Sequence, residues 1–163
     1  MPFLKLTTGE DVLVDEGDFE YLNQWKWHSE SGRYAVRKEY YGKAPNGEHL
    51  TRWIRMHRLI TDAPDKMEVD HINGNGLDNR RSNLRICTHK QNSHNTRKRK
   101  DNRSGYKGVG WHTQHNKWRA RIVVDGRQKH LGLFDTPEQA AIAYNTAAEQ
   151  FFGEFAHITK RGG

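Results

Sequence analysis

The sequence predicts an α+β protein assembled from small modules. Of its 163 residues, 34% are hydrophobic and 29% are charged, and the mean hydropathy is −1.04. This composition supplies modest cores rather than one large core. Short strand-like patterns fill much of the first half, and the last third combines strict alternation with alanines at helical spacing. We expect a small mixed N-terminal segment, then a strand-loop-strand-helix unit, then a three-stranded antiparallel sheet with one helix.

Charge and cysteine content narrow the class of protein. Lys and Arg number 27 against 20 for Asp and Glu, which gives a net charge of +7 and a pI near 9.6. Such an excess attracts polyanions, although a merely soluble basic protein stays an alternative. The single Cys87 excludes an internal disulfide framework and a multi-cysteine zinc site. Without a signal peptide or a long apolar run, we expect a cytoplasmic protein with no membrane association.

Residues 1–55 read as a small mixed segment. Strands are expected at 11–14, 33–40 and 50–56, with a turn at 45–47 between the last two. Asp18 is expected to cap a helical turn that runs to Trp25. Trp25 and Trp27 are expected in the core, because nothing in this segment demands chemistry.

The following stretch, 56–96, has the most distinctive pattern. A short amphipathic run at 56–60 and a loop at 62–66 lead into a strand at 68–71, a Gly- and Asn-rich loop at 73–82 and a strand at 84–87. Thr88 and Gln91 then form the capping box of a helix.

Asp70 and His71 stand side by side at the end of the first of these strands. Cleavage of a phosphodiester needs an activated water and a cation that stabilises the developing charge. Adjacent side chains of a regular strand point to opposite faces. Both residues therefore serve one site if the strand ends or bends at His71, which the glycine-rich loop allows.

This stretch resembles the HNH nuclease family, in particular the homing endonucleases of phages and group I introns. The matching residues are Met56-His-Arg-Leu, Val69-Asp-His-Ile-Asn-Gly-Asn75, Asn79 through Asn83-Leu-Arg85, and Gln91-Asn92 to Asn95. Asn83 follows His71 by 12 positions and Asn92 follows Asn83 by 9 positions, which is similar to the spacing of the ββα-metal motif. The resemblance implies that His71 is the general base, that Asp70 and Asn92 bind one metal ion, and that Asn83 holds the loop after His71.

Asn92 stands where the family name implies a histidine. Oxygen ligands from Asp and Asn favour Mg²⁺ or Mn²⁺ over Zn²⁺. His94 is expected to face away from Asn92, since two residues along a helix turn the side chain by about 200°. His57 and His89 are expected to be phosphate or structural contacts, and a role as metal ligand is the less favoured alternative for either.

Residues 97–105 form a basic connector, and Arg97, Lys98, Arg99 and Lys100 are expected on DNA phosphates. Beyond it, strands are expected at 106–112, 117–124 and 127–134, with a tight turn at 125–126. A helix is expected to begin with Thr136 as N-cap, Pro137 at its first position and Gln139 closing a capping box. Its apolar face is expected to contain Ala140, Ala143, Tyr144, Ala147, Ala148 and Phe151, and Gly153 is expected to end it.

The segment 106–163 resembles the AP2 DNA-binding domain. The resemblance is carried by Tyr106-Lys-Gly-Val109, Lys117-Trp-Arg-Ala-Arg-Ile122, Leu131-Gly-Leu-Phe-Asp135, Glu138-Gln-Ala-Ala141, Ala143-Tyr144 and Ala147-Ala148. It implies that the polar sheet face reads the major groove of DNA, through Lys107, Gly108, Gly110, His112, Arg119, Arg121, Gln128 and His130. Trp111, Trp118 and Tyr144 are expected in the core. A protein-binding sheet is the alternative.

Together these patterns and the two resemblances imply a metal-dependent homing endonuclease, encoded by a phage or mobile element of a bacterial host, that acts on double-stranded DNA. Its expected parts are 1–55, the nuclease at 56–96, the connector at 97–105 and the AP2-like domain at 106–163. A monomer with one site would nick, and a homodimer would permit cleavage of both strands. The alternatives are a DNA-binding regulator with a degenerate HNH scaffold and a nonspecific phage nuclease.

Overall fold

The computed structural model describes residues 2–95 and 102–158, so Arg97, Lys98, Arg99 and Lys100 lie outside the described residues. The fold is α+β, with small antiparallel sheets and helices. The chain divides into two compact units, Met1–His89 and Lys90–Gly163, which are described in turn. The boundary falls within a helix of the nuclease-like stretch rather than at the basic connector.

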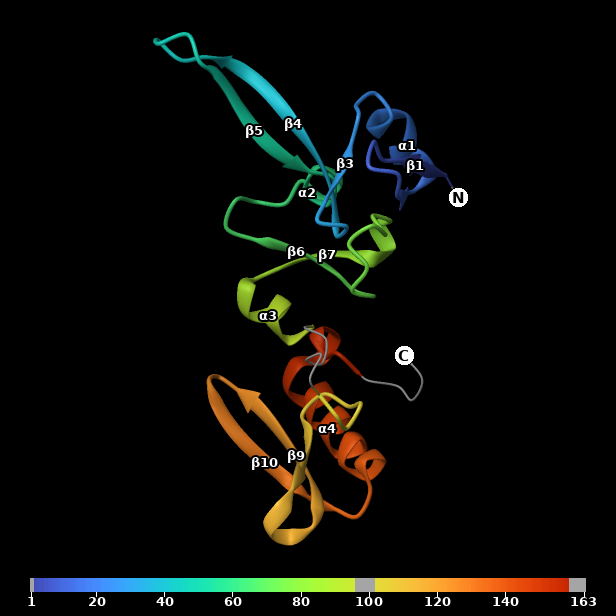
Figure 1. The fold of residues 1–163 in the computed structure, drawn as a ribbon, viewed down its shortest axis with the longest axis vertical. Coiled ribbons are helices and arrows are strands. Elements are labelled where there is room, and N and C mark those ends of the chain that lie inside the picture. The colour runs from blue at the N-terminus through green and yellow to red at the C-terminus, as the bar shows by residue number, and fades with distance from the viewer. Residues whose placement is uncertain (1, 96–101, 159–163) are drawn as a thin grey trace. The chain divides into compact units, whose positions relative to one another are not determined.

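The first unit contains three small sheets (Figure 1). In chain order its elements are β1 (Phe3–Lys5), β2 (Asp11–Leu13), α1 (Glu16–Leu22), β3 (His28–Glu30), β4 (Tyr34–Lys43), β5 (His49–Arg55), α2 (Met56–Thr61), β6 (Glu68–His71), the 3-10 turn η1 (Arg81–Asn83) and β7 (Leu84–Cys87). The sheets are β1-β2, β3-β4-β5 and β6-β7. β6 and β7 have the bounds expected from the sequence.

One core joins the N-terminal segment to the nuclease-like strands. Leu4 and Val12 of the first sheet pack in the same cluster as Val69 and Leu84 of β6 and β7. Trp27 is buried in this cluster and Trp25 packs against it, as expected for core aromatics. The N-terminal segment is therefore part of the scaffold that supports β6 and β7.

Two features of the first unit differ from the sequence prediction. Asp15, rather than Asp18, is the N-cap of α1, and Asp18 lies within the first turn of that helix. The Asp18 carboxylate instead binds the Arg81 guanidinium, with contacts of 2.7 and 2.8 Å. The strands β1 and β3 were not expected, because each has three residues and β3 is polar in sequence.

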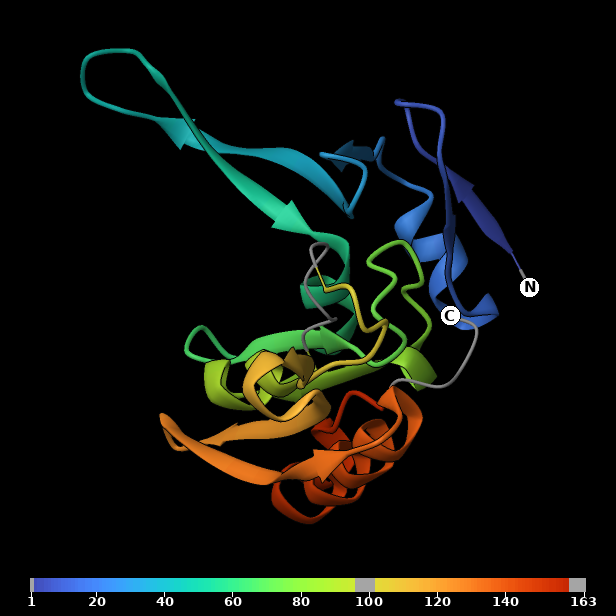
Figure 2. The ribbon, with the colours of Figure 1, turned by 60° about the horizontal axis from the view of Figure 1, so that its bottom comes forward.

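The hairpin of β4 and β5 extends away from the remainder of the first unit (Figures 1 and 2). Its strands pair in antiparallel register, and a bulge lies between Tyr40 and Gly42. The turn at its tip contains Gly47 with a φ of 83°, a conformation that favours glycine. The base of the hairpin packs on α2.

The second unit contains the end of α3 (His89–His94) and a three-stranded antiparallel sheet with one long helix. Its further elements are β8 (Val109–His112), the 3-10 turn η2 (Thr113–His115), β9 (Lys117–Val124), β10 (Arg127–Phe134), α4 (Pro137–Phe152) and the 3-10 turn η3 (Gly153–Phe155). The strand order is β10-β9-β8. β9 and β10 have the expected bounds, whereas β8 begins three residues later than expected.

Helix α4 covers one face of this sheet. Thr136 and Gln139 form the expected capping box, Pro137 begins the helix, and Gly153 ends it. Ala120 and Ile122 of β9 are buried against alanines of α4 and against Tyr144. Small side chains let the helix approach the strands closely.

The sequence prediction was wrong for two aromatic side chains of the second unit, Phe151 and Trp111, which were expected to be buried. Phe151 is 43% exposed, with Lys129 Nζ 4.4 Å from the centre of its ring, and Phe152 packs on the core in its place. Trp111 is 49% exposed, since it lies on the edge strand β8, where its ring contacts Trp118 edge-on at a centroid distance of 5.2 Å. Tyr144 is buried as expected.

Candidate active site and DNA interface

His71 is the last residue of β6. The strand therefore ends at the residue where an end or a bend was expected from the sequence. It pairs with Leu84, and the Gly74 amide donates to its carbonyl oxygen at 2.7 Å. The tight turn that follows redirects the chain directly after His71. Asp70 and His71 are both buried.

Asn83 holds the loop that follows His71. Its Oδ1 accepts from the Asn73 amide at 3.0 Å, and its Nδ2 donates to Asn73 Oδ1 at 3.1 Å and to the Asp78 carbonyl at 2.8 Å. Its own carbonyl accepts from the Ile72 amide at 2.9 Å. The buried Asn83 side chain therefore joins both ends of the loop, because each of its polar atoms meets backbone or side-chain partners in it.

Asp78 fixes the middle of the same loop. It is 1% exposed and accepts from Asn73 Nδ2 at 2.8 Å and from Arg80 Nε and Nη2 at 2.7 and 2.6 Å. The bonds from Arg80, with that from Asn73, hold the pKa of the Asp78 carboxyl below its ordinary value against the effect of burial. Backbone bonds between Leu13 and residues 77 and 79 attach the loop to β2.

The His71 ring lies in a small aromatic cluster. Its centroid is 5.1 Å from that of His57, edge to face, and 5.8 Å from that of Tyr34. Burial lowers the pKa of His71 below its ordinary value, while the Asn79 side chain and the carboxylates of Asp70 and Asp78 act in the opposite direction. At neutral pH the imidazole is therefore unprotonated, which is the form that a general base requires.

His57 is the buried neighbour of His71. Burial lowers its pKa from 6.5 to about 3, and the positive charges that His71, Arg55 and Arg58 carry when protonated add to this effect. Its ring also contacts Tyr34 at 5.3 Å. His57 thus packs from α2 as a neutral ring against the His71 side chain, which makes it a structural contact of the general-base candidate.

Asp70 forms an ion pair that the sequence analysis did not assign. Arg85 Nε and Nη2 both donate to Asp70 Oδ2, at 2.9 and 2.6 Å, and both side chains are largely buried. Arg85 lies opposite Asp70 in the β6-β7 register. Since both strand spans were predicted correctly, pairing them as a hairpin would have revealed this partner.

Asn92 lies in α3, on the part that belongs to the second unit. Three contacts attach this helix within that unit. Lys90 Nζ pairs with Asp125 at 2.5 Å, the His94 carbonyl accepts from Lys107 Nζ at 2.7 Å, and the His94 ring stacks on Phe152 at 3.8 Å. His89, at the start of α3, belongs to the first unit and contacts Glu68 through Nδ1 at 2.7 Å.

The sheet of the second unit gathers most of the expected DNA contacts on one face. His130 lies opposite Arg121, Gly110 lies opposite Arg119, and Arg121 Nη1 donates to Gln128 Oε1 at 3.2 Å. Residues directly opposite in an antiparallel pair share a face, and residues two apart along a strand do so as well. The shared face, turned away from α4, consists of Gly110, His112, Lys117, Arg119, Arg121, Gln128 and His130.

Lys107 and Gly108 have structural roles that the sequence did not indicate. Lys107 Nζ is engaged by the His94 carbonyl, and burial lowers its pKa to about 8. Gly108 has a φ of 72°, and a Cβ there would overlap the Tyr144 ring. Glycine is therefore required by packing at this position, whereas Gly110 is open.

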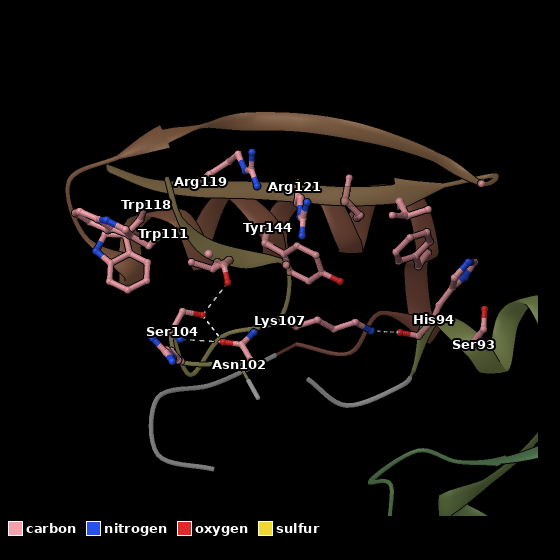
Figure 3. A pocket seen from close by; sticks show the side chains of 18 of the residues that line it. Ser93, His94, Asn102, Ser104, Lys107, Trp111, Trp118, Arg119, Arg121 and Tyr144 are labelled. Carbon is pink, nitrogen blue, oxygen red and sulfur yellow. Dashed lines mark hydrogen bonds between the residues drawn. The ribbon is translucent and has the colours of Figure 1, made fainter. Parts of the chain in front are cut away.

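Beside this sheet lies a pocket of about 970 Å³ within the second unit (Figure 3). Arg119 and Arg121 lie on the strand that borders it, Trp111 and Trp118 lie at one end, and His94 lies at the other. The pocket combines guanidinium groups with aromatic rings, which suits an anionic ligand that carries flat rings.

In the described ranges 2–95 and 102–158, no three His, Cys, Asp or Glu side chains cluster in a way that could hold a metal ion. None of the helices there is long and apolar enough to cross a membrane.

A buried neutral histidine next to a carboxylate, at the end of a strand and beside a fixed loop, is an arrangement suited to phosphodiester hydrolysis. The sequence profile of the HNH endonuclease family matches residues 55–94. An uncharacterized HNH endonuclease of Acanthamoeba polyphaga mimivirus is 37% identical over 152 residues, which are 93% of this chain and 76% of the relative. Protein 3.8 of Escherichia phage T7 is 35% identical over 76% of this chain and 99% of its own length. The chain belongs to the HNH endonuclease family and is a DNA nuclease.

The C-terminal part has relatives of a different kind. An AP2-like ethylene-responsive transcription factor of Arabidopsis thaliana is 48% identical over 52 residues, which are 31% of this chain and 9% of the relative. No solved structure matches the chain significantly.

Proposed function

We propose that the chain is a homing-type endonuclease that nicks double-stranded DNA, with His71 as the general base and with Asp70 and Asn92 as ligands of one Mg²⁺ or Mn²⁺ ion. The observation that carries the proposal is the environment of His71. Its imidazole is buried, unprotonated at neutral pH and placed beside a loop that Asn83 fixes through three side-chain hydrogen bonds.

In this mechanism His71 accepts a proton from the water that attacks the phosphorus. Tyr34 and His57 restrict rotation of its ring through the contacts described above. Asn83 acts as a positioning residue, because it holds the loop after His71. A bound divalent ion would stabilise the negative charge that develops on the phosphate and on the leaving oxygen.

The residues present suit such an ion. Carboxylate and amide oxygens are the hard donors that Mg²⁺ and Mn²⁺ prefer, and Mg²⁺ sites commonly use one or two carboxylates and complete their shell with water and phosphate. HNH nucleases generally use a divalent metal. At Asp70 the ion would share the carboxylate with Arg85, whose guanidinium contacts Oδ2.

We further propose that the sheet of the second unit is an AP2-like DNA-binding module. The likeness to the plant factors over 52 residues and the single basic face of the sheet support this assignment. Gly110, His112, Arg119, Arg121, Gln128 and His130 would contact DNA, and Arg97, Lys98, Arg99 and Lys100 would lie on phosphates. Lys107 and Gly108 belong to the proposed contact set as well, beside the packing contacts described above.

The homing and nonspecific alternatives are separated by mapping the cleavage positions. Purified protein is incubated with Mg²⁺ and a pool of long duplexes, one of which is the intronless target, and the new strand ends are sequenced. A homing enzyme produces ends at one position on one strand. Ends distributed over all duplexes would instead identify a nonspecific nuclease.

Both relatives described over most of this chain are viral, so a virus- or mobile-element-encoded enzyme acting on DNA inside an infected cell fits the proposal.

A further inference from the structure

The hairpin of β4 and β5 exposes large aromatic side chains that the proposed nuclease site does not use. Trp53 is 61% exposed, Tyr41 is 58% exposed and Tyr40 is 53% exposed. The hairpin extends away from the other elements of the first unit in both views (Figures 1 and 2). Exposed aromatic rings clustered on one element indicate an interaction surface.

The register gathers two of these side chains, Trp53 and Tyr40, on one face of the ribbon. Lys38 lies opposite Trp53 and Tyr40 lies opposite Thr51, so all four share a face. The Tyr40 ring contacts His49 at 5.0 Å, which adds His49 to the same side. We call these five residues, Lys38, Tyr40, His49, Thr51 and Trp53, the open face, because all five are exposed.

The open face is basic as well as aromatic. Lys38 Nζ lies 5.9 Å from the centre of the Trp53 ring, and no described carboxylate forms an ion pair with it. The nearby acid Glu39 alternates to the opposite face, where it is neutralised by Arg37 at 2.8 Å and by Arg52 at 2.7 Å. The open face therefore presents a cation next to flat rings, without a competing carboxylate of its own.

The strand that carries part of the open face begins beside the proposed nuclease site. β4 begins at Tyr34, whose ring lies 5.8 Å from that of His71. From there the strand continues for 10 residues, or about 33 Å at roughly 3.3 Å per residue. That length corresponds to about ten base pairs of duplex at 3.4 Å per step.

We propose that the β4-β5 hairpin is a DNA-binding ribbon that lies in a groove of duplex DNA to one side of the cleaved phosphate. A two-stranded β-ribbon fits the major groove. Lys38 would contact the phosphates, and Trp53, Tyr40 and Thr51 would contact sugars and base edges. The inference rests on the proposed function for the position of the cleaved phosphate, but not for the binding itself.

The test compares the double variant Trp53→Ala/Lys38→Gln with the matched control Phe3→Ala/Lys5→Gln. Phe3 and Lys5 are an exposed aromatic and an exposed lysine on β1, outside the hairpin. Binding to the intronless target duplex is measured in EDTA, by titration and by hydroxyl-radical footprinting. Circular dichroism and the thermal midpoint show that both variants fold.

We expect the hairpin variant to lose about five to ten protected base pairs on one flank, to raise Kd roughly tenfold, and to reduce the salt slope by about one. The control should keep the parent footprint. Equal footprints and Kd values in the two variants would overturn the inference. The parent could also bind DNA without cutting it, while the hairpin variant still loses the protected base pairs on one flank. That result would contradict the proposed function and would still support DNA binding by the hairpin.

Discussion

At the scale of single residues, the burial of His57 beside His71 makes the stability of the fold depend on pH. His57 is 6% exposed and its pKa falls from 6.5 to about 3 in the folded chain. The unfolded chain therefore binds a proton at His57 between these pH values, and the folded chain does not. Stability from this group is fully present above pH 6.5 and is lost as the pH falls towards 3.

The replacement His57→Phe tests this linkage. It keeps an aromatic ring beside Tyr34 and His71 but removes the titrating group. One proton contributes about 1.4 kcal/mol per pH unit, so lowering the pH from about 6.5 to about 4.5 should cost the parent roughly 2 to 3 kcal/mol more than the variant. Urea unfolding at several pH values measures the difference. Parallel pH profiles for the two proteins would contradict the assignment.

Asn83 offers a second test at this scale. Asn83→Ala removes three side-chain hydrogen bonds that fix the loop after His71. Since each unmade buried bond costs about 1 to 3 kcal/mol, we expect a lower thermal midpoint and at least a tenfold lower kcat, with KM little changed. Asn23→Ala, at the exposed C-cap of α1 outside the hairpin, is the control and should leave both quantities unchanged. A variant with reduced stability but parental kcat would remove Asn83 from the mechanism.

At the scale of elements, α3 carries the proposed ligand Asn92 and is attached to the C-terminal unit. The contacts of Lys90 with Asp125 and of His94 with Lys107 and Phe152 all lie within that unit. The position of the Asn92 side chain therefore depends on how firmly α3 is held by these contacts within the C-terminal unit.

The neighbouring residues Phe152 and Phe151 allow a matched comparison. Phe152→Ala removes the ring that stacks on His94, whereas Phe151 is exposed on the same helix turn. We expect Phe152→Ala to raise the Mg²⁺ concentration for half-maximal cleavage about tenfold, as for changes outside the ligand shell. Phe151→Ala should match the parent. An unchanged Mg²⁺ requirement in Phe152→Ala would show that this contact does not position Asn92.

Elements with strong local patterns were predictable from sequence. β6, β7, β9 and β10 begin and end where alternation and turn residues indicated. The same holds for α4, whose start is signalled by Thr136, Pro137 and Gln139, the residues of its N-terminal cap. The three-residue strands β1 and β3 were missed, because so short a stretch carries too little periodicity.

The candidate site residues Asp70, His71, Asn83 and Asn92 come from spacing and resemblance, whereas the contacts that support them could not be predicted from the sequence. The contacts of Asp15 and Asp18 with Arg81 join residues more than 60 positions apart in the sequence, so no local pattern signals them. The contact between Tyr34 and His71 joins two different sheets, so no local sequence pattern signals it either.

At the scale of the whole molecule, the proposed general base lies in the first unit and the proposed basic DNA face lies in the second. Arg121→Ala removes an exposed cation from the proposed DNA face of the sheet. We expect Kd for the target to rise roughly tenfold and the salt slope to fall by about one, with cleavage at saturating protein unchanged. Lys129→Ala is the control, because its register partner Ile122 faces α4. Equal losses in the two variants would indicate nonspecific charge rather than this face.

The central claim is that His71 is the base of a metal-dependent DNA nuclease, and single-turnover cleavage of supercoiled DNA tests it most directly. The parent should convert the substrate to nicked circles with Mg²⁺ and should be inactive in EDTA. His71→Ala should retain DNA binding and lose cleavage by about 100-fold or more, the scale of a general base. Cleavage by His71→Ala at the parental rate would contradict the account.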